Sequence, residues 1–164
     1  MGSGKTTIGA PLAAALGRPF LDNDELLRRR TGESAAEIAA RAGVDALHRI
    51  EAECLLEALR ARRAAVIAAA ASTITDEGVR DALSGAALVV WLRADPATLA
   101  TRLPGSTTRP FRDRDPEALV AEQARERDRL YDAVADLTVD TGVGEAADVV
   151  ARILASADER GLRV

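Results

Sequence analysis

The segment Gly2-Ser3-Gly4-Lys5-Thr6-Thr7, at the amino end of the chain, decides how the rest of the sequence is interpreted. Its glycines allow the backbone to turn N–H groups inward as a cradle for an anion. A helix that starts at about Lys5 points its positive end at the same place. Lys5 and Thr6 complete the end of the G-x-x-x-x-G-K-[ST] pattern of phosphate-binding loops, in which the lysine contacts the β- and γ-phosphates of ATP and the hydroxyl binds Mg²⁺. The alternative is a flexible Gly-Ser-Gly start without a function.

Lys5 is also the single lysine of the chain, beside 21 arginines. A compact ammonium on a thin stem can reach between phosphates, whereas the planar guanidinium of arginine suits bidentate contacts. Lysine therefore occurs only where the phosphate-binding loop needs it.

The first glycine of the full pattern would precede Met1, and so would the apolar strand that normally leads into such a loop. We expect Met1 to be an internal residue of the loop, so that the genomic sequence upstream encodes a short apolar strand in the same frame. The alternative is a truncated protein, which would have a gap in the core of its sheet and poor stability.

Downstream of the loop, short apolar runs alternate with amphipathic segments. We expect strands at residues 19–21, 65–71, 88–92 and 137–139. We expect helices at residues 5–16, 44–62, 76–83, 117–134 and 145–157, with further helix starts after residues 22, 34 and 95. Residues 104–116 lack periodicity and are expected to form a mobile lid. The alternation predicts an α/β fold, a three-layer αβα sandwich of the P-loop kinase type with a central parallel sheet that lacks its first strand, in a single domain over residues 1–164.

Composition narrows the possible functions. The net charge is −4, acidic and basic residues are interspersed, and the single cysteine, Cys54, leaves neither an internal disulfide nor a cysteine metal cluster. These features argue against a nucleic-acid-binding face. No apolar run is long enough for a membrane span, and no signal peptide precedes the loop. We expect a cytoplasmic monomer that binds a small-molecule substrate and neither nucleic acid nor membrane.

Beyond the loop, the order and spacing of several short motifs extend over nearly the whole chain. The chain resembles the shikimate kinase family, small P-loop kinases of aromatic amino-acid biosynthesis. The motifs that carry the resemblance are Gly2 to Gly9, Phe20 to Asp24, Thr31 to Ser34, Glu37-Ile38, Glu51, Gly78 to Arg80, Arg109-Pro110, Arg127 with Tyr131, and Val139 to Thr141.

The resemblance implies a role for each matching residue. On the nucleotide side, Gly2, Ser3, Gly4, Lys5, Thr6 and Thr7 would bind ATP, with Lys5 also catalytic. Thr6 and Asp22 would hold Mg²⁺, the aspartate through water. Arg102 would lie against the adenine, and Arg109 in the lid would close over the phosphates as a catalytic residue. The alternative for Arg109 is a plain surface residue.

On the acceptor side, the resemblance implies that Asp24 hydrogen-bonds the acceptor hydroxyl and is its general base, and that Arg127 binds the substrate carboxylate. Alternatives stay open for both. The segment Asp22-Asn23-Asp24 could be only a helix N-cap. Arg127 could lie on a solvated helix face together with Arg125 and Arg129.

Two positions depart from the family pattern. A Gly-Gly-Gly stretch is replaced by Ala70-Ala71-Ser72, which narrows the pocket around Ala71 and makes a positive φ costly there. A Phe-Arg pair is replaced by Leu47-His48, so that a permanently charged fork becomes an imidazole with an ordinary pKa near 6.5. If His48 is not an ordinary half-exposed helix residue, the affinity for shikimate should improve as the pH falls toward about 6.

Three functions follow. The first is ATP-dependent phosphorylation of shikimate to shikimate 3-phosphate. The second is a kinase for another small hydroxylated acceptor, and the third is a non-catalytic relative that only binds nucleotide.

Overall fold

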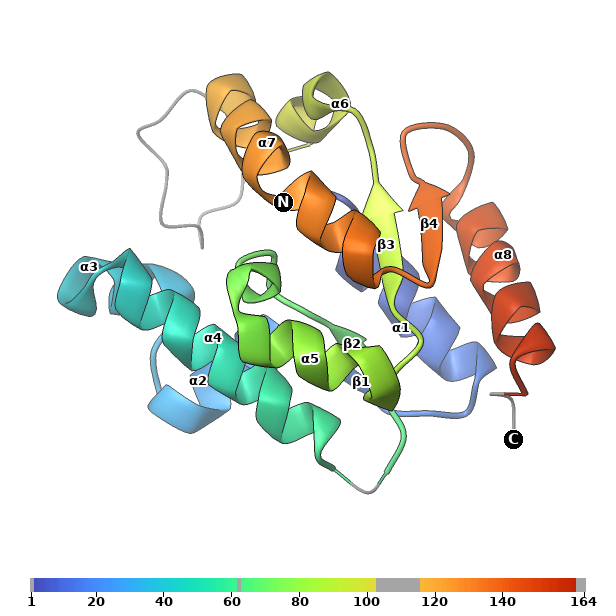
Figure 1. Ribbon diagram of the computed structural model, residues 1–164, viewed down its shortest axis with the longest axis horizontal. Helices are drawn as coiled ribbons and strands as arrows, with labels where there is room; N and C mark the ends of the chain where they lie inside the picture. The colour runs from blue at the N-terminus through green and yellow to red at the C-terminus, as the bar shows by residue number, and fades with distance from the viewer. Residues whose placement is uncertain (1, 62, 103–115, 162–164) are drawn as a thin grey trace.

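The computed structural model describes residues 2–61, 63–102 and 116–161. Its strands and helices alternate, as the sequence predicts (Figure 1). The strands are β1 Phe20–Asp22, β2 Val66–Ala68, β3 Val90–Arg93 and β4 Leu137–Asp140. The helices are α1 Lys5–Ala15, α2 Asn23–Thr31, α3 Ala35–Ala42, α4 Val44–Leu59, α5 Glu77–Ala86, α6 Pro96–Thr101, α7 Pro116–Val134 and α8 Ala146–Glu159, with a short 3₁₀ turn at Thr73–Thr75.

Side-chain caps fix where several helices begin. Ser34 and Glu37 form a capping box at α3, as expected from the sequence. The carboxylates of Asp76 and Asp95 each accept a backbone N–H three residues later, at 2.9 Å, and so start α5 and α6. Each cap satisfies a backbone donor that has no partner within its helix.

Several element boundaries differ from the prediction by a few residues, and α4 and β2 are two examples. Helix α4 ends at Leu59 instead of at about residue 62, and β2 is shorter than the apolar run at 65–71. The backbone leaves β2 early because Ser72 already has helical dihedral angles (φ −71°, ψ −30°) and leads into the 3₁₀ turn. The predicted lid at 104–116 and Arg109 within it lie outside the described residues, apart from Pro116 at the start of α7.

The strands form two parallel pairs, β1 with β2 and β3 with β4. The expected parallel strands are confirmed, and in the described residues they lie in these two pairs. A cavity of ≈ 1280 Å³ lies between the pairs and is lined by both β2 and β3.

Helices cover both faces of the strands. Val66 of β2 and Val90 and Leu92 of β3 pack against a buried cluster from α1, β4 and α8. Ile67, the neighbour of Val66, packs on the opposite side against α4 and α5, through Leu55 and Val79 among others. This alternation is the two-residue period of a strand that is buried on both faces.

Helix α1 approaches β1 closely because residue 9 is glycine. A Cβ atom at Gly9 would lie 2.5 Å from Cε2 of Phe20, a distance that real Cβ atoms do not show. The glycine therefore sets how deeply α1 can pack, and with it the position of the phosphate-binding loop at the amino end of α1.

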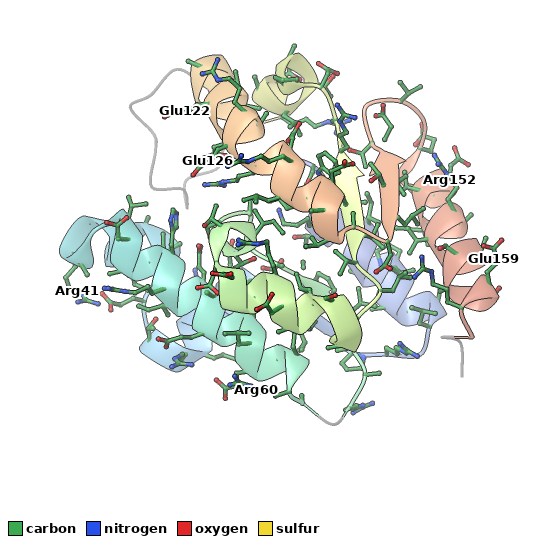
Figure 2. The ribbon with its side chains drawn as sticks, viewed as in Figure 1. Arg41, Arg60, Glu122, Glu126, Arg152 and Glu159 are labelled. Atoms are coloured by element: carbon green, nitrogen blue, oxygen red, sulfur yellow. The ribbon has the colours of Figure 1, made fainter. Side chains whose placement is uncertain are left out.

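Charged side chains are spread around the outside of the molecule, where the labelled residues Arg41, Arg60, Arg152 and Glu159 point away from the ribbon (Figure 2). Within the described ranges, no helix is both long enough and apolar enough to cross a membrane.

Candidate active site

The phosphate-binding loop has a backbone that only glycine adopts easily. Gly2 has φ +74° and Gly4 has φ +82°, both in the left-handed region. A Cβ at Gly2 would also lie 3.0 Å from the carbonyl oxygen of Leu99, so the loop passes close to α6. Gly4 is the N-cap of α1, and the positive end of that helix therefore points out of the loop.

Thr6 and Asp22, the two residues predicted to hold Mg²⁺, are in contact. The Thr6 hydroxyl donates a 2.9 Å hydrogen bond to Asp22 Oδ2, which joins the first turn of α1 to the carboxyl end of β1. Asp22 Oδ1 accepts the backbone N–H of Asp24 at 3.0 Å and caps α2. Asp22 can therefore be a helix N-cap and also belong to the predicted Mg²⁺ site, because one of its oxygens caps α2 and the other accepts from Thr6.

A cavity of ≈ 570 Å³ opens above the carboxyl ends of the strands. It brings together twelve of the thirteen residues that the sequence predicted for the site. They are Gly2, Ser3, Gly4, Lys5, Thr6, Thr7, Asp22, Asp24, His48, Ala71, Arg102 and Arg127. The thirteenth, Arg109, is outside the described residues. Ligands of parallel α/β sheets bind at this edge.

Arg102 lines this cavity beside the phosphate-binding loop. Its Cβ is 3.4 Å from the position that a Cβ on Gly2 would take, so α6 places the arginine beside the loop. Its Nη2 donates a 2.8 Å hydrogen bond to the carbonyl oxygen of Thr141, after β4. Arg102 thus connects the end of α6 with the segment after β4, which lies 39 residues further along the chain.

Arg127 lines the same cavity and is only 8% exposed. The solvated-face alternative is wrong for this residue, although its neighbours Arg125 and Arg129 are exposed. Among the described residues its buried Nε has no hydrogen-bond partner, and the nearest carboxylate oxygen, from Glu126, is 3.8 Å away. A buried guanidinium with an unsatisfied donor beside a cavity is suited to bind an anion.

Glu51 is a site residue to which sequence reasoning gave no role. Its carboxylate is 7% exposed and accepts a hydrogen bond from the Ser72 hydroxyl. Burial raises the pKa of Glu51, and the nearby carboxylate of Asp24 raises it further, against the lowering effects of Ser72, Arg127 and Lys5. Its position in the sequence could have revealed its burial. Glu51 is four residues after Leu47 and four before Leu55, so it lies on the same side of α4 as these two fully buried leucines.

His48 lies one turn before Glu51 on the same side of the cavity. Burial lowers its pKa below the ordinary value of 6.5, and the positive charge of Arg127 lowers it further, while Asp45 and Glu126 act in the opposite direction. The expectation of an unperturbed imidazole is therefore wrong. At neutral pH the ring is neutral, and Arg127 is the charged group at this end of the cavity.

The segment Ala70-Ala71-Ser72 has ordinary backbone geometry. No described non-glycine residue has a positive φ, so the predicted conformational cost of replacing glycine there is not observed. The carbonyl oxygen of Ala71 accepts a 3.0 Å hydrogen bond from the hydroxyl of Tyr131, which ties the end of β2 to α7. Burial raises the pKa of Tyr131 to about 12, which keeps this hydroxyl a donor.

Asn23 is a second residue that the sequence did not single out. It lines the cavity, is 1% exposed, and has no hydrogen-bond partner for either amide atom among the described residues. Buried amides are nearly always satisfied by protein, water or ligand. Its position between Asp22 and Asp24 places these unused groups next to the predicted metal and base positions.

A preformed cage of metal-binding side chains is absent from the described part of the chain, which holds no group of three or more His, Cys, Asp or Glu able to share an ion.

Comparison with known proteins gives a consistent result. The family model described as shikimate kinase matches residues 1–158. A shikimate kinase of Symbiobacterium thermophilum is 35% identical over 99% of this chain and 95% of its own length. That of Thermobifida fusca is 36% identical over 96% of this chain and 92% of its own length. The structure of shikimate kinase from Acinetobacter baumannii in complex with shikimate superposes with a TM-score of 0.92 at 33% identity, over 99% of this chain and 91% of that one. The chain therefore belongs to the shikimate kinase family.

Proposed function

We propose that the protein transfers the γ-phosphoryl group of ATP to the 3-hydroxyl of shikimate, on the three-layer αβα scaffold of a P-loop kinase. One observation carries the proposal. A single cavity is lined both by a phosphate-binding loop with the Thr6–Asp22 contact and by a buried arginine with an unsatisfied donor. The loop suits a triphosphate with its metal, and the arginine suits a carboxylate.

At the nucleotide end, the loop amides and Lys5 would bind the β- and γ-phosphates. Thr6 and Asp22 would hold Mg²⁺, which supplies charge neutralisation on the phosphate oxygens. Arg102 is positioned by Thr141 beside Gly2 and would contact the base of the nucleotide. Arg109 stays a prediction from the sequence, as the arginine that would close over the phosphates.

At the acceptor end, Arg127 would fix the substrate by its carboxylate, so that a ring hydroxyl faces Asp24. The Asp24 carboxylate would accept the proton of that hydroxyl while the new O–P bond forms and the bond from phosphorus to the leaving oxygen of ADP breaks. Glu51 would hold Ser72 in place at the wall of the pocket.

A second candidate is phosphorylation of a different small hydroxylated acceptor. His48 and Ser72 favour it, because both lie in the acceptor half and stand where the resemblance implies arginine and glycine. A neutral imidazole contributes less to binding a carboxylate than a guanidinium does. The nucleotide half is unaffected by these changes.

The test is a phosphorylation screen with purified protein, Mg²⁺ and ATP. Shikimate, quinate, related cyclitols and nucleosides would be compared by ADP release and by direct detection of the phosphorylated product. Phosphorylation of shikimate at the highest kcat/KM supports the first function. A better acceptor without a carboxylate supports the second, and ATP binding without transfer to any acceptor would support a non-catalytic nucleotide-binding protein.

A further inference from the structure

The buried carboxylate of Glu51 lies among groups of both charges. Burial and the carboxylate of Asp24 raise its pKa, whereas the hydrogen bond from Ser72 and the charges of Arg127 and Lys5 lower it. The residue is only 7% exposed, so water screens these interactions weakly. A carboxylate in this place is attracted by both cations, and its position therefore depends on the contact that holds it.

The hydroxyl of Ser72 makes such a contact. It donates a hydrogen bond to Oε2 of Glu51, and Ser72 is itself 6% exposed and lines the cavity of the candidate active site. The backbone of Ser72 is also held, because its carbonyl oxygen accepts the N–H of Thr75 at 3.0 Å and the hydroxyl of Thr75 at 2.8 Å. A donor on a fixed backbone thus holds the carboxylate at the wall of the cavity.

Arg127 makes no ion pair with Glu51, although the two side chains are close enough for their charges to interact. Among the described residues, its ion pair is with Glu126, at 3.8 Å from Nε, and Nε has no hydrogen-bond partner. An arginine already paired with a buried carboxylate would bind an entering anion less well, because its charge would be neutralised. The separation of Glu51 from Arg127 therefore keeps the guanidinium available.

The two departures from the family pattern meet at Glu51. Residue 48 precedes Glu51 by three positions on α4, and side chains three apart on a helix are neighbours. An arginine at position 48 would lie within reach of the Glu51 carboxylate, whereas His48 has a lowered pKa and is neutral at neutral pH. The hydroxyl that Ser72 adds in place of glycine supplies Glu51 with a donor.

We propose that Ser72 is a positioning residue that holds the Glu51 carboxylate away from Arg127, and so keeps the Arg127 guanidinium available to the acceptor. Without the hydroxyl, the carboxylate would move onto Arg127 and neutralise the group that binds the carboxylate of the acceptor. Only the identity of that anion rests on the proposed function, because the position of Glu51 can be measured in the protein without substrate.

The first test measures the pKa of Glu51 in the free protein by carbon-13 NMR, with Glu51→Gln used to assign the signal. In Ser72→Ala, the simple loss of a hydrogen bond would raise this pKa, because that bond favours the charged carboxylate. Movement of the carboxylate onto Arg127 would lower the pKa, because a guanidinium in contact stabilises the charged form more than a hydroxyl does. We expect the pKa to fall, and a rise overturns the proposal.

The second test is steady-state kinetics of Ser72→Ala with shikimate and ATP. We expect the KM for shikimate to rise by about tenfold, as for the loss of one charge-assisted contact, with smaller changes in kcat and in the KM for ATP. In the Glu51→Gln background, Ser72→Ala should raise the KM by no more than about twofold, because no charge remains to pair with Arg127. Thr73→Val is the matched control, since it removes a hydroxyl of the same turn that bonds to the carbonyl oxygen of Ala70.

The outcomes distinguish this proposal from the proposed function. If the parent does not phosphorylate shikimate, the proposed function fails, and the pKa of Glu51 in Ser72→Ala still decides the role of Ser72. If the KM for ATP rises in place of that for shikimate, the carboxylate has moved to Lys5 and the proposal is wrong. It is also wrong if Glu51→Gln does not suppress the effect of Ser72→Ala. If Ser72→Ala does not fold, the same comparisons are made with Ser72→Gly.

Discussion

The proposed nucleotide half and the proposed acceptor half of the cavity are built in different ways. The nucleotide half consists of one short segment, residues 2–7, together with the Thr6–Asp22 contact, and its shape follows from glycine backbone angles. The acceptor half is assembled from side chains on α4, α7 and the end of β2, and its buried charges influence one another's pKa values. A substitution in the first half should therefore act on catalysis, and a substitution in the second on substrate choice.

Lys5→Ala should give the largest effect. Removal of the cation at the phosphates should lower kcat by about 10²-fold or more, weaken ATP binding, and leave the fold intact. ADP release, nucleotide titration and circular dichroism measure the three quantities. If the variant turns over at the parental rate, the interpretation of the loop is wrong.

Arg127→Ala should act on the acceptor alone. Loss of a charge-assisted contact of about 1.5–3 kcal/mol should raise the KM for shikimate by about 10- to 100-fold, with little change in the KM for ATP. Arg125→Ala on the same helix is the matched control, because Arg125 is exposed. Equal effects of the two substitutions would contradict the difference between the halves.

His48→Arg should lower the KM for shikimate by roughly tenfold, with a smaller effect on kcat, because the contact exists in both the ground and transition states. In the parent, the KM should fall as the pH drops below 6.5, since only the protonated ring attracts a carboxylate and its pKa is lowered. Steady-state kinetics between about pH 5 and 8 test both statements. Reversion of Ala70-Ala71-Ser72 to glycine, alone and with His48→Arg, shows whether the pocket wall limits the gain.

The smallest expected effects are on the pH dependence of stability, and His48 and Glu51 act in opposite directions. The pKa of His48 is lower in the folded state, so its contribution is lost as the pH falls from 6.5 through the folded value. The pKa of Glu51 is raised, so its contribution is lost as the pH rises from 4.5 through the folded value. Urea unfolding of the parent and of Glu51→Gln across this range should show that the variant gains relative stability as the pH rises. If the difference in the free energy of unfolding between the parent and Glu51→Gln does not change with pH, the raised pKa of Glu51 is contradicted.

The same contrast explains what the sequence could and could not predict. Residues 2–7 act through local backbone geometry, so their spacing alone identified the loop. The alternation of apolar runs identified the strands, but it did not show which strands pair: β2 pairs with β1, and β3 pairs with β4. Glu51, Ser72 and Asn23 acquire their roles from burial beside elements distant in sequence. The effect of Arg127 on the pKa of His48 likewise depends on the fold, which brings a residue of α7 near a residue of α4.

The chain carries its own optical reporter for the acceptor half. Trp91 is the only tryptophan, and its ring stacks on Tyr131 with centroids 5.4 Å apart, beneath the guanidinium of Arg93. The same Tyr131 bonds to Ala71 at the wall of the acceptor pocket. Trp91 is thus connected to that wall through one ring contact and one hydrogen bond. If acceptor binding moves the wall, the fluorescence of Trp91 should change, and binding can be followed without a label.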